Sequence, residues 1–190
     1  MSVEPFFSEF EKLYVEDKPQ VVWNTLIADL ETPVSAMLKL ANNKPNSFLL
    51  ESVEGGSVRG RYSIIGMDPD IIWRCHGNKA EINHLTKKTK GEFKNCPGNS
   101  IESLSELVKK SQIELPESMP PMAAGLVGYL GYDTVTLMEK IPLTLTDPIK
   151  LPDGLFIRPT IMAIFDLVKD TIIIVTPVRP TKDTSPKSAY

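Results

Sequence analysis

Cysteine, aromatic residues and long apolar runs are all scarce in this sequence. Its 190 residues include 2 cysteines, and aromatic residues make up 7% of the chain. Cys75 and Cys96 are expected to be free thiols, because the sequence shows no secretory signal that would favour a disulfide framework. The longest mostly apolar run, residues 122–132, falls short of the ~20 residues that a membrane-spanning helix requires. No membrane partner is therefore expected.

An excess of charge of one sign is missing as well. The chain has 21 Lys and Arg against 24 Asp and Glu, a formal net charge of −3, so no strong field would gather nucleic acid. The lysines between residues 87 and 94 have one aromatic neighbour, Phe93, which is typical of a solvated loop. A signal peptide begins with basic residues and an apolar run, whereas the amino terminus of this chain carries glutamates. We therefore expect a cytoplasmic protein.

Motifs that carry chemistry in other proteins find little support here. Zinc sites need clustered pairs of ligands, whereas this chain offers one sparse set of cysteine and histidine between residues 75 and 84. Nothing such as G-x-S-x-G supports nucleophilic catalysis. Gly125, Gly128 and Gly131 form a G-x-x-G-x-x-G run, which differs from the dinucleotide fingerprint. The run indicates instead a strand that another backbone approaches closely.

Strands outnumber helices in the predicted secondary structure. They are expected where β-branched and apolar residues gather, at residues 19–28, 48–53, 62–66, 71–75, 79–83, 123–131, 160–168 and 171–175. Tight turns at Gly77-Asn78 and Lys169-Asp170 join neighbouring strands. The sequence therefore predicts an α+β fold of mainly antiparallel sheets, sandwich-like, with a few flanking helices.

Four helical segments are expected. Two are short, over residues 5–15 and 133–139, and a third begins at Thr32-Pro33, with threonine as the cap and proline at the first helical position. The fourth follows Asn99, which forms a capping box with Glu102. Its core-facing stripe is predicted to consist of four apolar residues, Ile101, Leu104, Leu107 and Val108.

Residues 46–66 are the most informative stretch. Two apolar runs flank a polar connection that opens with Glu51-Ser52 and turns at Gly55-Gly56, since glycine adopts positive φ without steric strain. Such a hairpin sets a carboxylate and a hydroxyl beside an apolar sheet, which suits a small zwitterion with an apolar body, such as an amino acid. The plainer alternative is that Glu51 and Ser52 are polar residues that end a strand.

Within this stretch, Leu-Leu-Glu-Ser followed by Gly-Arg-Tyr-Ser-Ile-Ile-Gly resembles the amino-terminal region of anthranilate synthase component I, the large subunit. Two further stretches agree with that family: Ala-Asp-Leu-Glu-Thr-Pro-Val-Ser at 28–35, and Gly-Leu-Val-Gly-Tyr-Leu-Gly-Tyr-Asp at 125–133. The resemblance runs in order from about Phe10 to Tyr190. Three matches in register are more specific than any one of them.

The resemblance implies a parent lyase that makes anthranilate and pyruvate from chorismate and is inhibited by tryptophan. Residues 1–190 would form its amino-terminal regulatory and structural domain, with 176–190 as a linker or the start of the next element. The chorismate-binding catalytic domain would lie outside this sequence, which alone is expected to be inactive and to hold no catalytic residue. By the same resemblance, the tryptophan effector pocket is lined by Pro33, Glu51, Ser52, Tyr62 and Ser63.

The resemblance also implies a cofactor and partners. Mg²⁺ is expected for the parent enzyme, with ligands outside this segment. The expected partners are L-tryptophan as effector, the glutamine amidotransferase subunit (component II) and the chain's own carboxy-terminal domain. Two alternatives stay open: the amino-terminal region of the aminodeoxychorismate synthase large subunit, which serves the folate pathway, and a stand-alone amino-acid-binding module.

Overall fold

The chain folds into two compact units. The computed structural model describes residues 2–42, 44–51, 60–85, 91–142 and 147–190. Unit 1 consists of residues 1–68, 113–124 and 159–190, and unit 2 of residues 69–112 and 125–158. Each unit is described by itself below.

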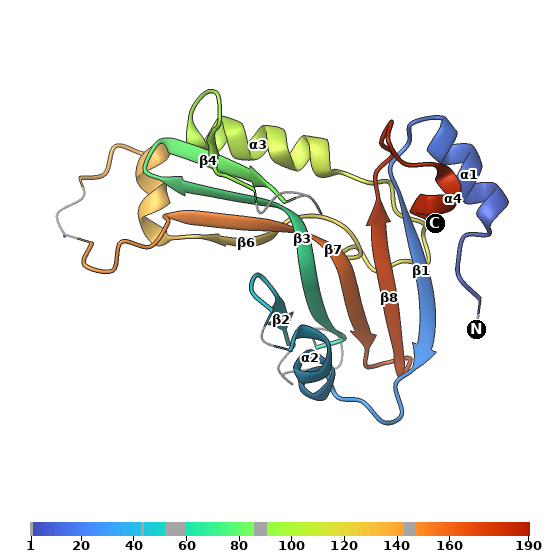
Figure 1. Cartoon of the computed structure of the whole chain (residues 1–190). Coiled ribbons are helices and arrows are strands. Elements are labelled where there is room, and N and C mark those ends of the chain that lie inside the picture. Colours follow the sequence, from blue (N-terminus) through green and yellow to red (C-terminus); the bar gives the residue numbers. More distant parts are fainter. Residues whose placement is uncertain (1, 43, 52–59, 86–90, 143–146) are drawn as a thin grey trace. The chain divides into compact units, whose positions relative to one another are not determined.

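Antiparallel strands dominate both units (Figure 1). Among the described residues, 8 strands form a hydrogen-bonded sheet of order β1-β8-β7-β3-β4-β5, in which β2 also pairs with β3 and β6 with β7. The strands are β1 (Gln20–Ile27), β2 (Phe48–Leu50), β3 (Tyr62–His76), β4 (Lys79–His84), β5 (Lys94–Asn95), β6 (Val127–Leu130), β7 (Gly154–Asp166) and β8 (Thr171–Val178). The predicted α+β class, mainly antiparallel with a few helices, is confirmed.

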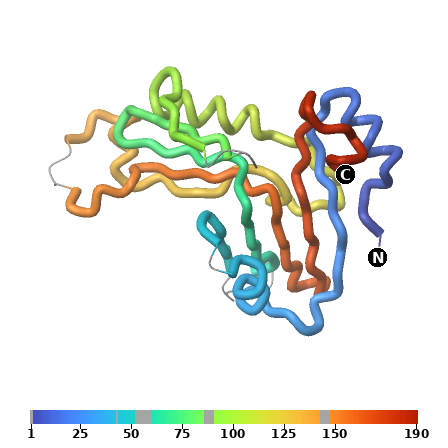
Figure 2. The backbone as a smooth tube through the Cα atoms, viewed as in Figure 1, coloured from blue at the N-terminus to red at the C-terminus, as the bar shows by residue number. Residues whose placement is uncertain are grey.

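Unit 1 carries helices α1 (Phe7–Val15), α2 (Pro33–Ala41) and α4 (Pro186–Ala189). Helices α1 and α4 lie side by side, because the Tyr190 ring packs 5.4 Å from that of Phe7 and 5.1 Å from that of Phe10, centroid to centroid. The Tyr190 hydroxyl donates a hydrogen bond of 2.9 Å to the Pro5 carbonyl. Both ends of the described chain thus meet in unit 1 (Figure 2). The segment expected as a linker, 176–190, includes the end of β8 and all of α4.

Two apolar clusters occupy opposite faces of the sheet in unit 1. Successive side chains of a strand point to opposite faces, and β3 shows this directly. Ile64 packs in a cluster with Met162 and Val175, whereas Ile65 packs in a second cluster with Phe165 and helix α2. Neighbouring residues of β3 therefore face different clusters.

Unit 2 carries helix α3 (Ser100–Ser111) and the 3₁₀-helix η1 (Tyr132–Leu137). The predicted capping box at the start of α3 is confirmed, with Asn99 and Glu102 bonding each other's backbone N–H groups. The predicted apolar stripe of α3 is partly wrong, because Val108 is 44% exposed. The helix buries Leu107 together with three serines, Ser100, Ser103 and Ser111.

The glycine run has the structural role that its spacing predicts. In β6, Gly128 lies opposite Phe156 of β7. A Cβ at this position would overlap the Leu155 carbonyl oxygen and lie 2.7 Å from the Phe156 Cα. Close approach of two backbones therefore requires glycine here.

Several predicted boundaries are wrong. The strands expected at 62–66 and 71–75 are one strand, β3, which passes through Asp68 in a left-handed conformation (φ 48°). The strand expected over 123–131 begins only at Val127, because Gly125 has φ 147° and bends the preceding chain. The helix expected over 133–139 is the 3₁₀-helix η1.

The turn between β7 and β8 is longer than predicted. Strand β7 ends at Asp166 and β8 begins at Thr171. The Asp166 carboxylate accepts hydrogen bonds from the backbone N–H groups of Val168 (3.1 Å) and Lys169 (3.3 Å). An aspartate that bonds the backbone just ahead of it favours a turn, which explains why the strand stops there.

Candidate functional site

The two strands that flank the candidate effector site pair as predicted, while the predicted turn at Gly55-Gly56 lies outside the described residues. Strands β2 and β3 pair antiparallel, with Leu49 opposite Ile65 and Leu50 opposite Ile64. Phe48 lies opposite Gly66, where a Cβ would overlap the phenylalanine ring. These contacts fix the register of the two strands up to the end of β2.

Glu51 and Ser63 occupy matching positions at the end of this register. Glu51 directly follows β2 and is exposed. It stands one residue beyond the Leu50–Ile64 pair, so its counterpart on β3 is Ser63, which is 1% exposed. The structure therefore places these two predicted site residues next to the last pair of the β2–β3 ladder. The predicted contact Ser52 lies outside the described residues.

Tyr62 and Ser63 lie on opposite faces of β3. Ser63 shares its face with Ile65, whose cluster includes Leu49 and the α2 residues Ala36 and Met37. Tyr62 packs with the other cluster, that of Ile64. The structure thus groups Ser63 with helix α2 and does not bring Tyr62 to the same side.

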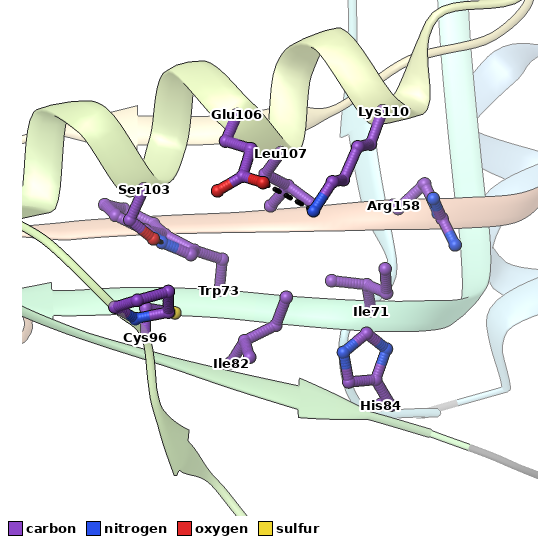
Figure 3. Close-up of a pocket in the computed structure, with 11 residues that line it drawn as sticks. Ile71, Trp73, Ile82, His84, Cys96, Ser103, Glu106, Leu107, Lys110 and Arg158 are labelled. Atoms are coloured by element: carbon purple, nitrogen blue, oxygen red, sulfur yellow. Dashed lines mark hydrogen bonds and ion pairs between the residues drawn. The ribbon is translucent and has the colours of Figure 1, made fainter.

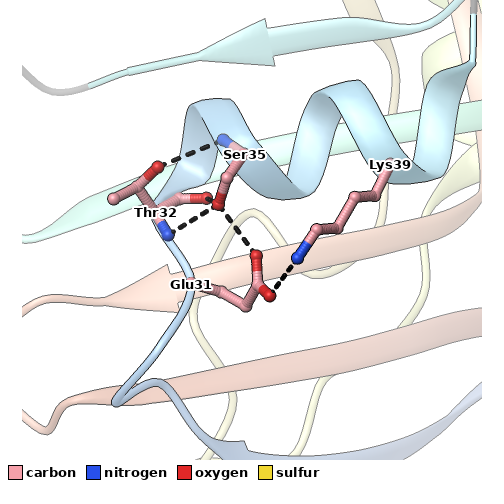
Figure 4. Close-up of polar contacts among 4 residues, drawn as sticks. All are labelled: Glu31, Thr32, Ser35 and Lys39. Atoms are coloured by element: carbon pink, nitrogen blue, oxygen red, sulfur yellow. Dashed lines mark hydrogen bonds and ion pairs between the residues drawn. The ribbon is translucent and has the colours of Figure 1, made fainter.

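Pro33 stands at the start of α2, as the sequence predicts. Thr32 is the N-cap and Pro33 the first helical residue. The Ser35 N–H donates to Thr32 Oγ1 (3.1 Å), and the Thr32 N–H donates to Ser35 Oγ (3.0 Å), which completes a capping box. This reciprocal pair, drawn in Figure 4, satisfies two backbone donors of the helix start. Pro33 follows directly as the first helical residue.

Replacing Thr32 by alanine should therefore destabilise unit 1 by about 1 kcal/mol, the usual effect of losing an N-cap side chain. Thr32→Ser keeps the hydroxyl and should unfold within a few tenths of a kcal/mol of wild type. Urea unfolding followed by circular dichroism measures both variants. An equal decrease in the free energy of unfolding for Thr32→Ala and Thr32→Ser would show that the hydroxyl does not act as the cap.

Glu31 is a polar anchor of the same helix start that the sequence analysis missed. Its carboxylate accepts a hydrogen bond from Ser35 Oγ (2.8 Å) and an ion-pair contact from Lys39 Nζ (Figure 4). Lys39 and Ser35 together lower the pKa of the Glu31 carboxyl. An acidic residue just before the N-cap, close to the positive end of the helix dipole, is the signal that would have found it.

A second missed feature is an ion pair beside Tyr62. Arg61 binds Asp166 in a bidentate manner, with Nε donating to Oδ1 (2.9 Å) and Nη2 to Oδ2 (2.7 Å). The Arg61 guanidinium also lies 4.8 Å from the centre of the Tyr62 ring. These hydrogen bonds hold the pKa of the buried Asp166 carboxyl below its ordinary value. The pair fixes the first residues of β3 against the β7–β8 turn.

Neither a membrane span nor a metal cluster is found in the part of the chain that the structure describes. No helix there combines the length and the apolar character needed to cross a bilayer. In the same residues, no three His, Cys, Asp or Glu side chains gather where they could hold a metal ion.

Comparison with known proteins finds relatives that share one name. No family model matches it. Anthranilate synthase component 1 of Cereibacter sphaeroides is 44% identical over 184 residues, which are 97% of this chain and 37% of that protein. Proteins of the same name from Synechocystis sp. and Thermus thermophilus are 36% and 37% identical over 90% and 84% of this chain.

The chain is a homologue of the amino-terminal region of anthranilate synthase component 1. It spans about a third of the length of these curated relatives (37%, 33% and 32%). A solved structure, anthranilate synthase component I from Streptococcus pneumoniae TIGR4, aligns with 86% of this chain and 33% of that one, at 21% identity and a TM-score of 0.49. The names of the curated relatives do not favour the aminodeoxychorismate synthase alternative.

Proposed function

We propose that this chain is the tryptophan-sensing, amino-terminal portion of a longer anthranilate synthase component 1. The complete enzyme would convert chorismate, with glutamine or ammonia, to anthranilate and pyruvate, and would act in tryptophan biosynthesis. Support comes from 44% identity to a protein of that name across 97% of this chain. On this proposal the segment itself regulates and is not catalytic.

The observation that carries the sensing role is the end of the β2–β3 pair. Glu51 follows and Ser63 precedes the last pair of the register, Leu50 and Ile64, and the face of Ser63 is the one that α2 covers. Pro33 begins that helix. A carboxylate, a hydroxyl and a helix start beside an apolar cluster offer the groups that a free amino acid needs.

The proposed pocket binds tryptophan through an apolar slot and polar anchors. Burial of about 200 Å² of indole contributes about 5 kcal/mol before ordering costs are subtracted. Glu51 accepts from the ammonium group, while Ser52 and backbone N–H groups donate to the carboxylate. Tryptophan binding would favour a less active arrangement of the enzyme, with a coupling of about 1–3 kcal/mol.

Three further properties of the complete enzyme are part of the proposal. The Mg²⁺ ion that polarises the substrate would be held by ligands outside this segment, and the described residues hold no group of three His, Cys, Asp or Glu side chains that would fit it. A glutamine amidotransferase subunit would supply ammonia. The enzyme would work in the cytoplasm.

Calorimetric titration of the complete protein with tryptophan tests the sensing role. Glu51→Gln should weaken binding at least tenfold, because it removes the partner of the ammonium group while leaving the volume unchanged. Ser52→Phe should also reduce affinity by filling the pocket. Tyr62→Phe is the matched control and should bind as wild type does, since Tyr62 packs on the face opposite to Ser63.

Wild-type affinity in both Glu51→Gln and Ser52→Phe would contradict the pocket. The proposed activity of the complete enzyme is tested separately, by identifying the product that it forms from chorismate and ammonia. Fluorescent anthranilate is the expected product, and its absence would contradict the proposed activity whatever the titration shows.

A further inference from the structure

A cavity of about 380 Å³ lies inside unit 2. It opens between α3 and strands β3 and β4, with Trp73 and Ile71 below and Leu107 above (Figure 3). Its volume falls at the small end of the 300–1,000 Å³ typical of ligand pockets. None of its lining residues belongs to the proposed tryptophan pocket, whose residues all lie in unit 1.

The cavity exists because α3 turns serines toward the sheet. A helix that packs on a sheet normally presents large apolar side chains, but α3 buries Ser103 and Ser111 on either side of Leu107. Trp73 Nε1 donates to Ser103 Oγ (2.9 Å), and Arg158 Nη1 donates to Ser111 Oγ (3.3 Å). The short side chains therefore hold the walls in place without filling the space, although filling it would add stability.

The buried residues that line the cavity do not require a polar ligand. Trp73, Ile71 and Leu107 are 1%, 4% and 6% exposed, and the indole N–H already has its partner in Ser103. The Arg158 guanidinium is bound by Asp70 through two hydrogen bonds of 2.7 Å. The indole N–H and the guanidinium thus already have partners, and the other buried lining residues named here are apolar, so the interior suits an apolar body.

The mouth of the cavity is polar and offers donors. Glu106 and Lys110 reach from α3 toward the opening and form an ion pair of 2.6 Å (Figure 3). An ammonium group has three N–H donors, and this contact uses one of them. His84 lines the opposite rim and is exposed. Unused donors at the rim above an apolar interior suit a ligand with a flat apolar body and one carboxylate.

We propose that this α3–sheet cavity is a second binding site, for a small aromatic or other flat apolar carboxylate. The ligand places its ring system between Leu107 and the β3–β4 surface, and its carboxylate accepts from Lys110 Nζ at the rim. The site is independent of the proposed tryptophan pocket.

Protein-observed NMR of the ¹⁵N-labelled 190-residue chain tests the site, with 2-naphthoate as the probe and uncharged 2-naphthamide as its isosteric control. Naphthoate should shift amide signals of α3, β3 and β4 in a saturable manner. Lys110→Ala should weaken naphthoate binding at least fivefold and change naphthamide binding less than twofold. Lys109→Ala is the matched control, because the neighbouring lysine is not among the lining residues, and it should leave both affinities unchanged.

Ile82→Phe provides a second variant, since a larger ring on the lining strand β4 occupies the cavity. It should weaken both probes at least tenfold while leaving the amide spectrum of unit 1 unchanged. Shifts centred outside α3, β3 and β4, no saturable shift up to the solubility limit, or equal effects of Lys109→Ala and Lys110→Ala would each overturn the proposal.

Discussion

Replacing Gly128 by alanine is expected to separate β6 from β7 and to lower the free energy of unfolding by about 3 kcal/mol, the upper end for overpacking. The added methyl group would meet the backbone of Leu155 and Phe156. A strand backbone held in a ladder moves less readily than the end of a flexible side chain, so the pair must open. Urea unfolding followed by circular dichroism gives the change directly.

Gly131→Ala is the matched control for this variant. It belongs to the same glycine run, and the atom nearest to its added Cβ is the Asp153 carbonyl oxygen at 3.2 Å. A shift of a few tenths of an ångström relieves that contact, so the variant should lose less than about 1 kcal/mol. Equal unfolding midpoints for the two variants would contradict the close approach at Gly128.

The glycine run also shows how far sequence reasoning reaches. Its composition predicts that a second backbone comes close, and the structure confirms this at Gly128. Which of the three glycines is essential depends on the pairing of β6 with β7, and their partner residues, such as Gly128 and Phe156, are 28 positions apart (156 − 128). Periodicity within one strand carries no information on that register.

Local features were predicted well, and long-range ones were not. The N-cap predicted at Thr32 and the capping box predicted at Asn99 depend on residues within three positions of each other, and both are present. The Arg61–Asp166 and Arg158–Asp70 pairs join residues 105 and 88 positions apart, so no local pattern indicates them. The burial of Ser103 and Ser111 on α3 is not predictable from local sequence either, because their partners Trp73 and Arg158 lie on strands β3 and β7, far away in the chain.

The candidate site contains both features that local sequence predicts and features that depend on long-range contacts. The antiparallel pairing of β2 with β3 and the helix start at Pro33 follow from local sequence and are confirmed. The separation of Tyr62 from Ser63 follows from the two-residue period of a strand, which the resemblance to a family motif does not take into account. The cover that α2 provides on one face depends on tertiary packing alone.

Asp166→Asn is expected to lower the free energy of unfolding by about 2 kcal/mol at pH 7, by weakening a charge-assisted pair. The Asp166 side chain is 2% exposed and that of Arg61 36% exposed. Solvent therefore screens part of their charge interaction, which limits the expected decrease. The amide retains one oxygen for the N–H groups of Val168 and Lys169 but cannot accept both guanidinium hydrogen bonds.

The effect of Asp166 must also depend on pH, and the direction follows from its pKa. Hydrogen bonds from Arg61 lower the pKa of this carboxyl in the folded chain, whereas the unfolded value is about 3.9. The stabilisation is therefore complete above about pH 4 and is lost as the pH falls through the lower folded pKa. Wild type and Asp166→Asn should differ most near pH 7 and converge as the pH falls below the folded pKa of Asp166. Asp170→Asn, on the same turn but exposed, should follow wild type at every pH. A constant gap between wild type and Asp166→Asn across that range would show that the carboxylate charge is not what stabilises the β7–β8 turn.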